Sequence, residues 1–137
     1  MEYLAVTDHS PSLVIANGLS AERLAEQARE IEAVNALGLG TTLLKGVEVD
    51  ILPDGRLDHP DEVLARLDVV VASVHSSFGM DREEQTRRVL RALENPHVDI
   101  LGHPSGRLLS RRDGYELDWE EVFRTAARAG TALEINA

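Results

Sequence analysis

The sequence contains no cysteine, and its 14 Lys and Arg residues are outnumbered by 24 Asp and Glu, which gives a formal net charge of −10. The absence of cysteine excludes disulfide bonds and any zinc or iron–sulfur site with thiolate ligands. The excess of acidic residues argues against a broad basic face that binds nucleic acid. No apolar run approaches the roughly 20 residues of a membrane-spanning helix, and no signal peptide opens the chain. We therefore expect a soluble, cytoplasmic protein without a membrane partner.

Short apolar segments rich in β-branched residues alternate with helical patterns along the 137 residues. Strands are predicted at 2–7, 43–49, 68–74, 97–101 and 131–136. Helices are predicted between 20 and 38, at 61–67, between 81 and 95 and between 118 and 130, with Ser20, Asp81 and Asp118 as N-terminal caps. This alternation predicts one α/β domain with a parallel sheet, either an open doubly wound sheet or a barrel. The nearly continuous apolar runs predict strands that are buried on both faces.

Both ends of the chain coincide with predicted strands. The first predicted strand begins at residue 2 and the last one ends at residue 136. A natural domain usually leaves a few loosely held residues outside its terminal elements. We therefore expect residues 1–137 to form a single partial domain, the middle of a larger one.

All five predicted strands end in polar residues. The residues at or just beyond these ends are His9, Glu48, His75, His103 and Asn136. The C-terminal ends of parallel strands meet at one edge of the sheet, where ligands bind and catalytic residues gather. A lone histidine at a strand end is often only hydrogen bonded to the backbone, but three histidines and a glutamate at successive ends favour a zinc, manganese or iron site. The other two histidines, His59 and His97, lie away from this edge and are expected to be solvated.

Five short motifs occupy these strand ends. They are Thr7-Asp8-His9-Ser10, Glu48-Val49-Asp50, Ser73-Val74-His75-Ser76, Gly102-His103-Pro104 and Glu134-Ile135-Asn136. In this order they resemble the motifs of the PHP (polymerase and histidinol phosphatase) family of metal-dependent phosphoesterases. The longer segments 3–11, 48–55 and 102–109 are most similar to the PHP domain at the C-terminus of bacterial family-X DNA polymerases.

The resemblance implies a fold and a set of ligands. The fold would be a distorted (βα)7 TIM-like barrel, the PHP fold, of which this chain supplies the central five βα units. His9, Glu48, His75 and His103 would be ligands of up to three divalent metals (zinc, manganese or iron), with Glu48 bridging two of them. Asp8 would orient these ligands or water. The family's first His-x-His motif and last Asp-x-His motif are missing, so about half of the ligands are present.

The resemblance also implies hydrolysis of phosphoester bonds. In a family-X polymerase this would be 3′–5′ exonuclease activity or related processing of DNA 3′ ends in DNA repair, with the DNA delivered by the parent polymerase. One alternative is a histidinol-phosphate-type phosphatase that acts on a small monoester. Another is a structural, inactive PHP domain; the intact ligands argue against it for a longer parent, but the 137 residues alone are expected to have little activity.

Three residues are the candidates for contact with the substrate. Arg107 follows His103 most closely and is the preferred phosphate ligand, ahead of Arg111 and Arg112, because guanidinium groups bind phosphate as forks. A solvated basic loop is the alternative. Ser76 and Asn136 are the other two candidates, although Ser76 could simply cap a turn.

Overall fold

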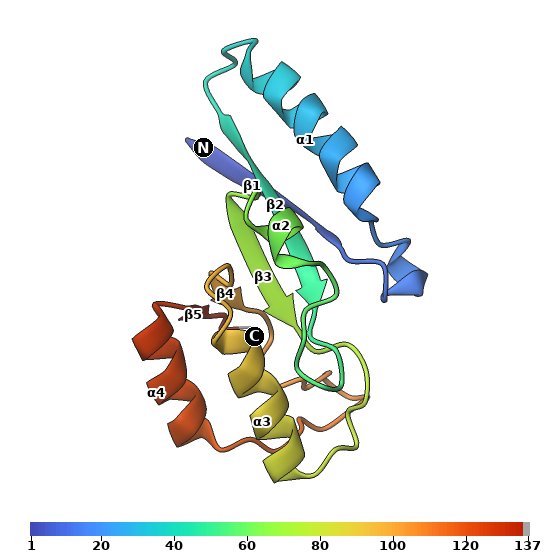
Figure 1. Cartoon of the computed structure of the whole chain (residues 1–137), viewed down its shortest axis with the longest axis vertical. Helices are drawn as coiled ribbons and strands as arrows, with labels where there is room; N and C mark the ends of the chain where they lie inside the picture. The colour runs from blue at the N-terminus through green and yellow to red at the C-terminus, as the bar shows by residue number, and fades with distance from the viewer. Residues whose placement is uncertain (136–137) are drawn as a thin grey trace.

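The computed structural model describes residues 1–135, in which strands and helices alternate (Figure 1). The strands are β1 (Tyr3–His9), β2 (Thr42–Asp50), β3 (Val69–Ser73), β4 (Ile100–Leu101) and β5 (Ala132–Leu133). The helices are η1 (Val14–Ala16, a 3-10 helix), α1 (Ala21–Asn35), α2 (Asp61–Leu64), α3 (Arg82–Leu93) and α4 (Trp119–Ala129). The predicted α/β alternation is confirmed, and no helix among these residues is long and apolar enough to cross a membrane.

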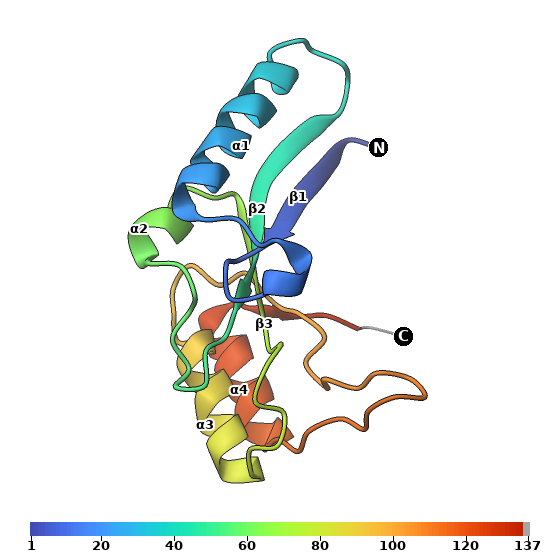
Figure 2. The same cartoon turned by 90° about the vertical axis from the view of Figure 1, so that its right-hand side faces the viewer.

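The five strands form one parallel sheet in the order β1-β2-β3-β4-β5. Each strand therefore pairs with the next strand along the chain. In Figure 2 all four α-helices lie on one side of this sheet, and only the short η1 helix lies on the other side among residues 1–135. This one-sided arrangement differs from that of a doubly wound sheet, which carries helices on both faces. β1 and β5 form the two edges, and the sheet does not close within the described residues.

The core lies between the helices and one face of the sheet. Val47, Val49, Val70 and Ala72 face the helices and are at most 1% exposed. Their neighbours on the opposite face, such as Val71, are only partly buried. The prediction that these strands are buried on both faces is therefore wrong for the described residues. Their apolar character on the second face belongs to a surface that no α-helix within residues 1–135 covers, which we call the open face.

The predicted caps of the helices are confirmed. The Asp81 carboxylate accepts a hydrogen bond from the Glu84 N–H at 2.8 Å, and Asp118 accepts one from the Glu121 N–H at 3.2 Å. Ser20 caps α1 in the same way, through a longer contact of 3.4 Å. Each such cap contributes about 1 kcal/mol. The caps set the first residue of each helix and so the length of the loop that joins it to the preceding strand.

Candidate metal centre

The register of the sheet places His9 beside Glu48. The two residues are paired across β1 and β2, and Glu48 is paired in turn with Val71 of β3. Paired residues of a parallel sheet share a face, so the His9 and Glu48 side chains both lie on the open face. His75 and His103 follow two residues after the ends of β3 and β4. The predicted residues thus meet at the C-terminal edge of the sheet.

Three imidazoles surround the Glu48 carboxylate. The Nε2 atoms of His103, His75 and His9 lie 3.0, 3.2 and 3.7 Å from its oxygens. The ring of His75 stands 5.0 Å from the ring of His9 and 5.0 Å from that of His103, in edge-on arrangements. All four side chains are partly buried, with exposed fractions between 15% and 29%. The structure therefore brings the four predicted ligands into one cluster.

This cluster has the composition of a divalent-metal site. His9, Glu48 and His75 each offer a ligand atom, and these atoms all lie within 4.8 Å of one another. Imidazole nitrogen and carboxylate oxygen are the ligands that zinc, manganese and iron share. The Nδ1 atom of His9 is buried and has no hydrogen-bond partner within residues 1–135. The residues fit a bound cation, and their individual roles as ligands stay a prediction.

The charges of the cluster stabilise one another. Burial by itself would raise the pKa of Glu48, but hydrogen bonds with His103 and His75 outweigh it and hold that pKa well below its usual range. Burial would lower the pKa of His75, but the carboxylates of Asp50 and Glu48 raise it to about 9. Strongly perturbed groups that converge in this way are typical of functional sites.

Asp50 is a contact of the cluster that the sequence analysis did not single out. Its carboxylate lies against Nδ1 of His75, while Nε2 of that ring faces Glu48. Asp50 is 3% exposed, and its own N–H donates to the Ser10 hydroxyl at 2.9 Å. A carboxylate on one ring nitrogen fixes the tautomer and direction of a histidine whose other nitrogen binds metal. The signal in the sequence was the spacing Glu48-x-Asp50, which puts both carboxylates on the same face of β2.

Glu134 is the second contact that was not predicted. Its Oε2 atom accepts a hydrogen bond of 2.5 Å from the backbone N–H of His103. His103 has a φ of +26°, in the region that favours glycine, so its backbone conformation needs support from neighbouring residues. Glu134 follows β5, and it therefore links the last described strand to the position of His103.

The other predicted site residues lie outside the cluster. Asp8 points to the helix side of β1, where its carboxylate accepts a hydrogen bond from Nε2 of Gln27 at 2.5 Å. This placement does not favour the predicted role of Asp8 in orienting the ligands, and Asp50 contacts His75 instead. Ser76 is exposed next to His75, and Arg88 donates to its carbonyl oxygen at 2.9 Å. Arg107 is exposed beyond His103, and Asn136 lies outside the described residues.

His59 differs from its prediction. It was expected to be solvated, but it is 4% exposed, and burial lowers its pKa. The loop after β2 folds back along that strand, with the Asp58 N–H donating to the Asp50 carbonyl at 3.0 Å, and this fold buries the ring. His97 is partly buried. Neither histidine belongs to the cluster around Glu48.

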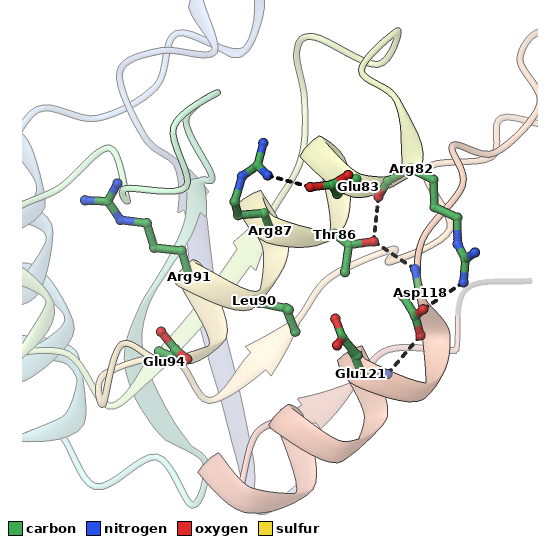
Figure 3. A pocket seen from close by; sticks show the side chains of 9 residues that line it. All are labelled: Arg82, Glu83, Thr86, Arg87, Leu90, Arg91, Glu94, Asp118 and Glu121. Atoms are coloured by element: carbon green, nitrogen blue, oxygen red, sulfur yellow. Dashed lines mark hydrogen bonds and ion pairs between the residues drawn. The ribbon is translucent and has the colours of Figure 1, made fainter.

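A groove of about 830 Å³ lies between α3 and α4 and shares no residue with the cluster (Figure 3). Its walls carry both positive and negative side chains, four of which pair with one another. Arg82 pairs with Asp118 at 2.8 Å, and Arg87 pairs with Glu83 at 3.2 Å. These two ion pairs occupy four of the charged side chains that line the groove.

Comparison with known proteins finds relatives that match the chain almost from end to end. It is 54% identical over 99% of its length to the DNA polymerase/3′–5′ exonuclease PolX of Bacillus subtilis (strain 168). It is 35% identical over 99% of its length to a probable phosphatase of Thermoanaerobacter sp. (strain X514), and 34% identical over 99% to one of Acetivibrio thermocellus. The chain spans 24% of the polymerase and about half of the two phosphatases (52% and 53%). No family model matches the chain. The resemblance to a family-X polymerase is confirmed.

Proposed function

We propose, from the similarity of this chain to part of a DNA polymerase/3′–5′ exonuclease and to part of several probable phosphatases, that it contributes four ligands to the metal centre of a phosphoesterase domain. One observation carries the proposal. Three imidazoles from the ends of β1, β3 and β4 converge within 3.7 Å of the Glu48 carboxylate on β2, at the edge of a parallel sheet where catalytic sites form.

The same proposal assigns the fold to the PHP type. The sequential strand order and the helices on one side are those of consecutive βα units in a barrel wall. In a closed (βα)7 barrel the open face would line the interior. The partly buried apolar side chains of that face, such as Val71, suit this position.

Each residue of the cluster has a distinct task in the proposed mechanism. Glu48 offers two carboxylate oxygens, one facing His9 and the other facing His75 and His103, and so suits a ligand that bridges two metals. Asp50 holds the His75 ring, and Glu134 holds the His103 backbone. A divalent cation bound there would polarise the phosphoester and activate water for attack. No nucleophilic side chain is required, in agreement with the absence of cysteine.

Two substrates fit this chemistry. The similarity to PolX favours 3′–5′ exonuclease action on DNA 3′ ends, whereas the similarity to probable phosphatases favours a small phosphomonoester. We place the exonuclease first because the identity is 54% in one case and 35% in the other. An inactive, structural role is disfavoured because all four predicted ligands converge.

The test uses the full-length protein, stripped with EDTA and reloaded with Mn²⁺, Zn²⁺ or Fe²⁺. A single-stranded oligonucleotide labelled at its 5′ end should be shortened stepwise from its 3′ end only when metal is restored. Faster release of phosphate from a small monoester than of nucleotides would support the phosphatase instead. Absence of hydrolysis of both substrates with all three metals would refute the phosphoesterase proposal.

A further inference from the structure

The loop between β4 and α4, residues 104–116, extends from the metal centre on the side of the sheet away from the helices (Figure 2, orange). It begins directly after His103, and the Gly106 N–H donates to the His103 carbonyl at 2.9 Å. The loop is therefore attached to the cluster at its base. We call it the clamped loop, for the contacts described next.

An arginine and two aromatic rings hold the base of the clamped loop. The Arg112 guanidinium carbon lies 3.5 Å from the centre of the Phe78 ring, and its Nη2 and Nε atoms donate to the Gly106 carbonyl at 2.8 and 3.0 Å. The Phe78 ring stacks on Tyr115, with ring centres 6.3 Å apart. Phe78 lies three residues after His75, so this contact joins the segments that carry two of the predicted metal ligands. Arg112 is thus occupied within the protein, and the sequence-based alternative that it binds phosphate is not favoured.

Gly106 is required for this close packing. Its φ is +59°, and a Cβ atom built on it would lie 2.1 Å from Cε1 of Tyr115. Beyond it, Leu108 and Arg112 form an antiparallel bridge, with hydrogen bonds of 2.9 Å in both directions. The base of the clamped loop is therefore constrained by hydrogen bonds and by ring contacts.

The tip of the clamped loop has the opposite character. Arg107 and Arg111 are exposed and make no side-chain hydrogen bond or ion pair with any described residue. Leu108 and Leu109 between them are 47% and 65% exposed. These side chains line a shallow hollow of about 390 Å³. Unpaired guanidinium groups bind phosphate oxygens, and exposed leucines offer an apolar surface to a base.

We propose that the clamped loop is the specificity-determining element of this site and binds a single strand of nucleic acid next to the reacting phosphoester. Arg107 and Arg111 contact backbone phosphates, Leu108 and Leu109 contact a base, and the Arg112–Phe78 contact positions the tip. The inference rests on the proposed phosphoesterase function and deepens it, because a small monoester needs no contact at a distance from the cluster. The four exposed residues at the tip would then distinguish a polymeric substrate from a small monoester. Two of them supply positive charge in a chain whose net charge is −10.

The first experiment measures binding without catalysis. Fluorescence anisotropy reports the Kd of a labelled single-stranded oligonucleotide for the full-length protein in EDTA, at several salt concentrations. Arg107→Ala with Arg111→Ala should weaken binding about tenfold and reduce the slope of log K against log salt by about 1.4, for two lost contacts with a single strand. The matched control, Arg87→Ala with Arg124→Ala, removes the same charge from α3 and α4 and should leave the slope unchanged. Equal slopes for both double variants would overturn the proposal.

The second experiment separates positioning from stability. Phe78→Leu removes the ring, and Phe78→Tyr keeps it. We expect Phe78→Leu to weaken oligonucleotide binding as much as the tip variant and to accelerate trypsin cleavage after Arg107 and Arg111 below the melting temperature, whereas Phe78→Tyr matches the parent. If Phe78→Leu does not fold, Arg112→Lys tests the same contact, because a lysine cannot reproduce the fork on Gly106. Parent-like binding and trypsin sensitivity in a folded variant would contradict the positioning role.

Hydrolysis of bis(p-nitrophenyl) phosphate by the Mn²⁺-loaded proteins keeps the two proposals apart. This small diester requires the cluster and not the clamped loop. A smaller fall in hydrolysis of this diester than in oligonucleotide binding by the tip variant supports the inference. Loss of both activities in the tip variant would contradict it. Absence of hydrolysis by the parent protein would count against the proposed function, while the EDTA binding data would still test the clamped loop.

Discussion

The sheet edge and the α3–α4 groove differ in how their charges are balanced. The groove has a volume of about 830 Å³, and four of its charged side chains form two ion pairs with each other (Figure 3). At the sheet edge the Glu48 carboxylate faces three imidazoles, and a histidine carries charge only when it is protonated. The neighbouring carboxylates raise the pKa of one of these imidazoles, His75, to about 9. Titratable groups that converge and shift each other's pKa values therefore indicate a functional site better than the volume of a hollow does.

The largest effect that would sharpen this comparison is expected for Glu48→Gln. The amide has one neutral oxygen acceptor where the carboxylate has two charged ones, so the centre of the cluster is lost. Metal content, measured by mass spectrometry, and the rate of hydrolysis should both fall. Loss of a residue that only hydrogen bonds to a metal ligand costs up to about 100-fold, so loss of the ligand itself should lower hydrolysis by more than about 100-fold. Glu83→Gln in the groove is the matched control and should leave both unchanged. Full metal content and activity in Glu48→Gln would remove Glu48 from the site.

A smaller effect is expected for Asp50→Asn. The amide cannot accept a charge-assisted hydrogen bond from Nδ1 of His75, so the ring loses the partner that fixes its tautomer. Metal affinity, measured by competition with a chelator, should fall about 10- to 100-fold. Asp118→Asn changes a carboxylate in the groove and serves as the control. An unchanged affinity in Asp50→Asn would mean that the contact with His75 is structural only.

Stability against pH should distinguish the metal-free from the metal-loaded protein. The pKa of His75 is raised from about 6.5 to about 9, so its contribution is fully present below pH 6.5 and is lost as the pH rises through 9. The pKa of Glu48 is lowered, so its contribution is present above about pH 4.5 and is lost as the pH falls. The melting temperature of the metal-free protein should therefore fall between pH 6.5 and 9.

Metal binding should respond to pH in the opposite direction. A cation must displace the proton of His75, so its apparent affinity should rise with pH, by up to about tenfold per unit below pH 9. The metal-loaded protein should consequently keep its melting temperature over the range in which the metal-free protein loses stability. Parallel melting profiles for both forms, measured by circular dichroism, would show that His75 does not exchange a proton for metal.

The alternation of strands and helices and the four-residue cluster could be predicted because they follow from local patterns. Strand ends are visible as changes in hydrophobic period, and a parallel sheet brings its C-terminal ends together, so His9 and Glu48 needed no further information. The contact of Asp50 with His75 depends on how the chain turns after β3. The Arg112–Phe78 contact joins two loops. Such contacts are set by loop conformation and carry no periodic signal.

The burial of the sheet could not be predicted for a related reason. An apolar run such as 69–73 has the same composition whether one face or both faces are covered. Whether a second layer covers each face depends on the rest of the fold and on the handedness of the connections. Among residues 1–135 these connections put all of the α-helices on one side of the sheet. Burial of His59 depends on the fold of the loop after β2, which lacks a pattern in sequence. Local composition predicted the elements, and long-range packing decided their surroundings.

The smallest effect is expected in the groove. Arg87 and Glu83 are exposed and lie one helical turn apart, so Arg87→Ala should change the free energy of unfolding by less than about 0.5 kcal/mol, as measured by urea denaturation. Metal affinity should not change, because the pair shares no contact with the cluster. High salt should reduce even this small difference, since it screens exposed pairs. A change in metal affinity would break the comparison, because the groove and the sheet edge would then be energetically coupled rather than independent.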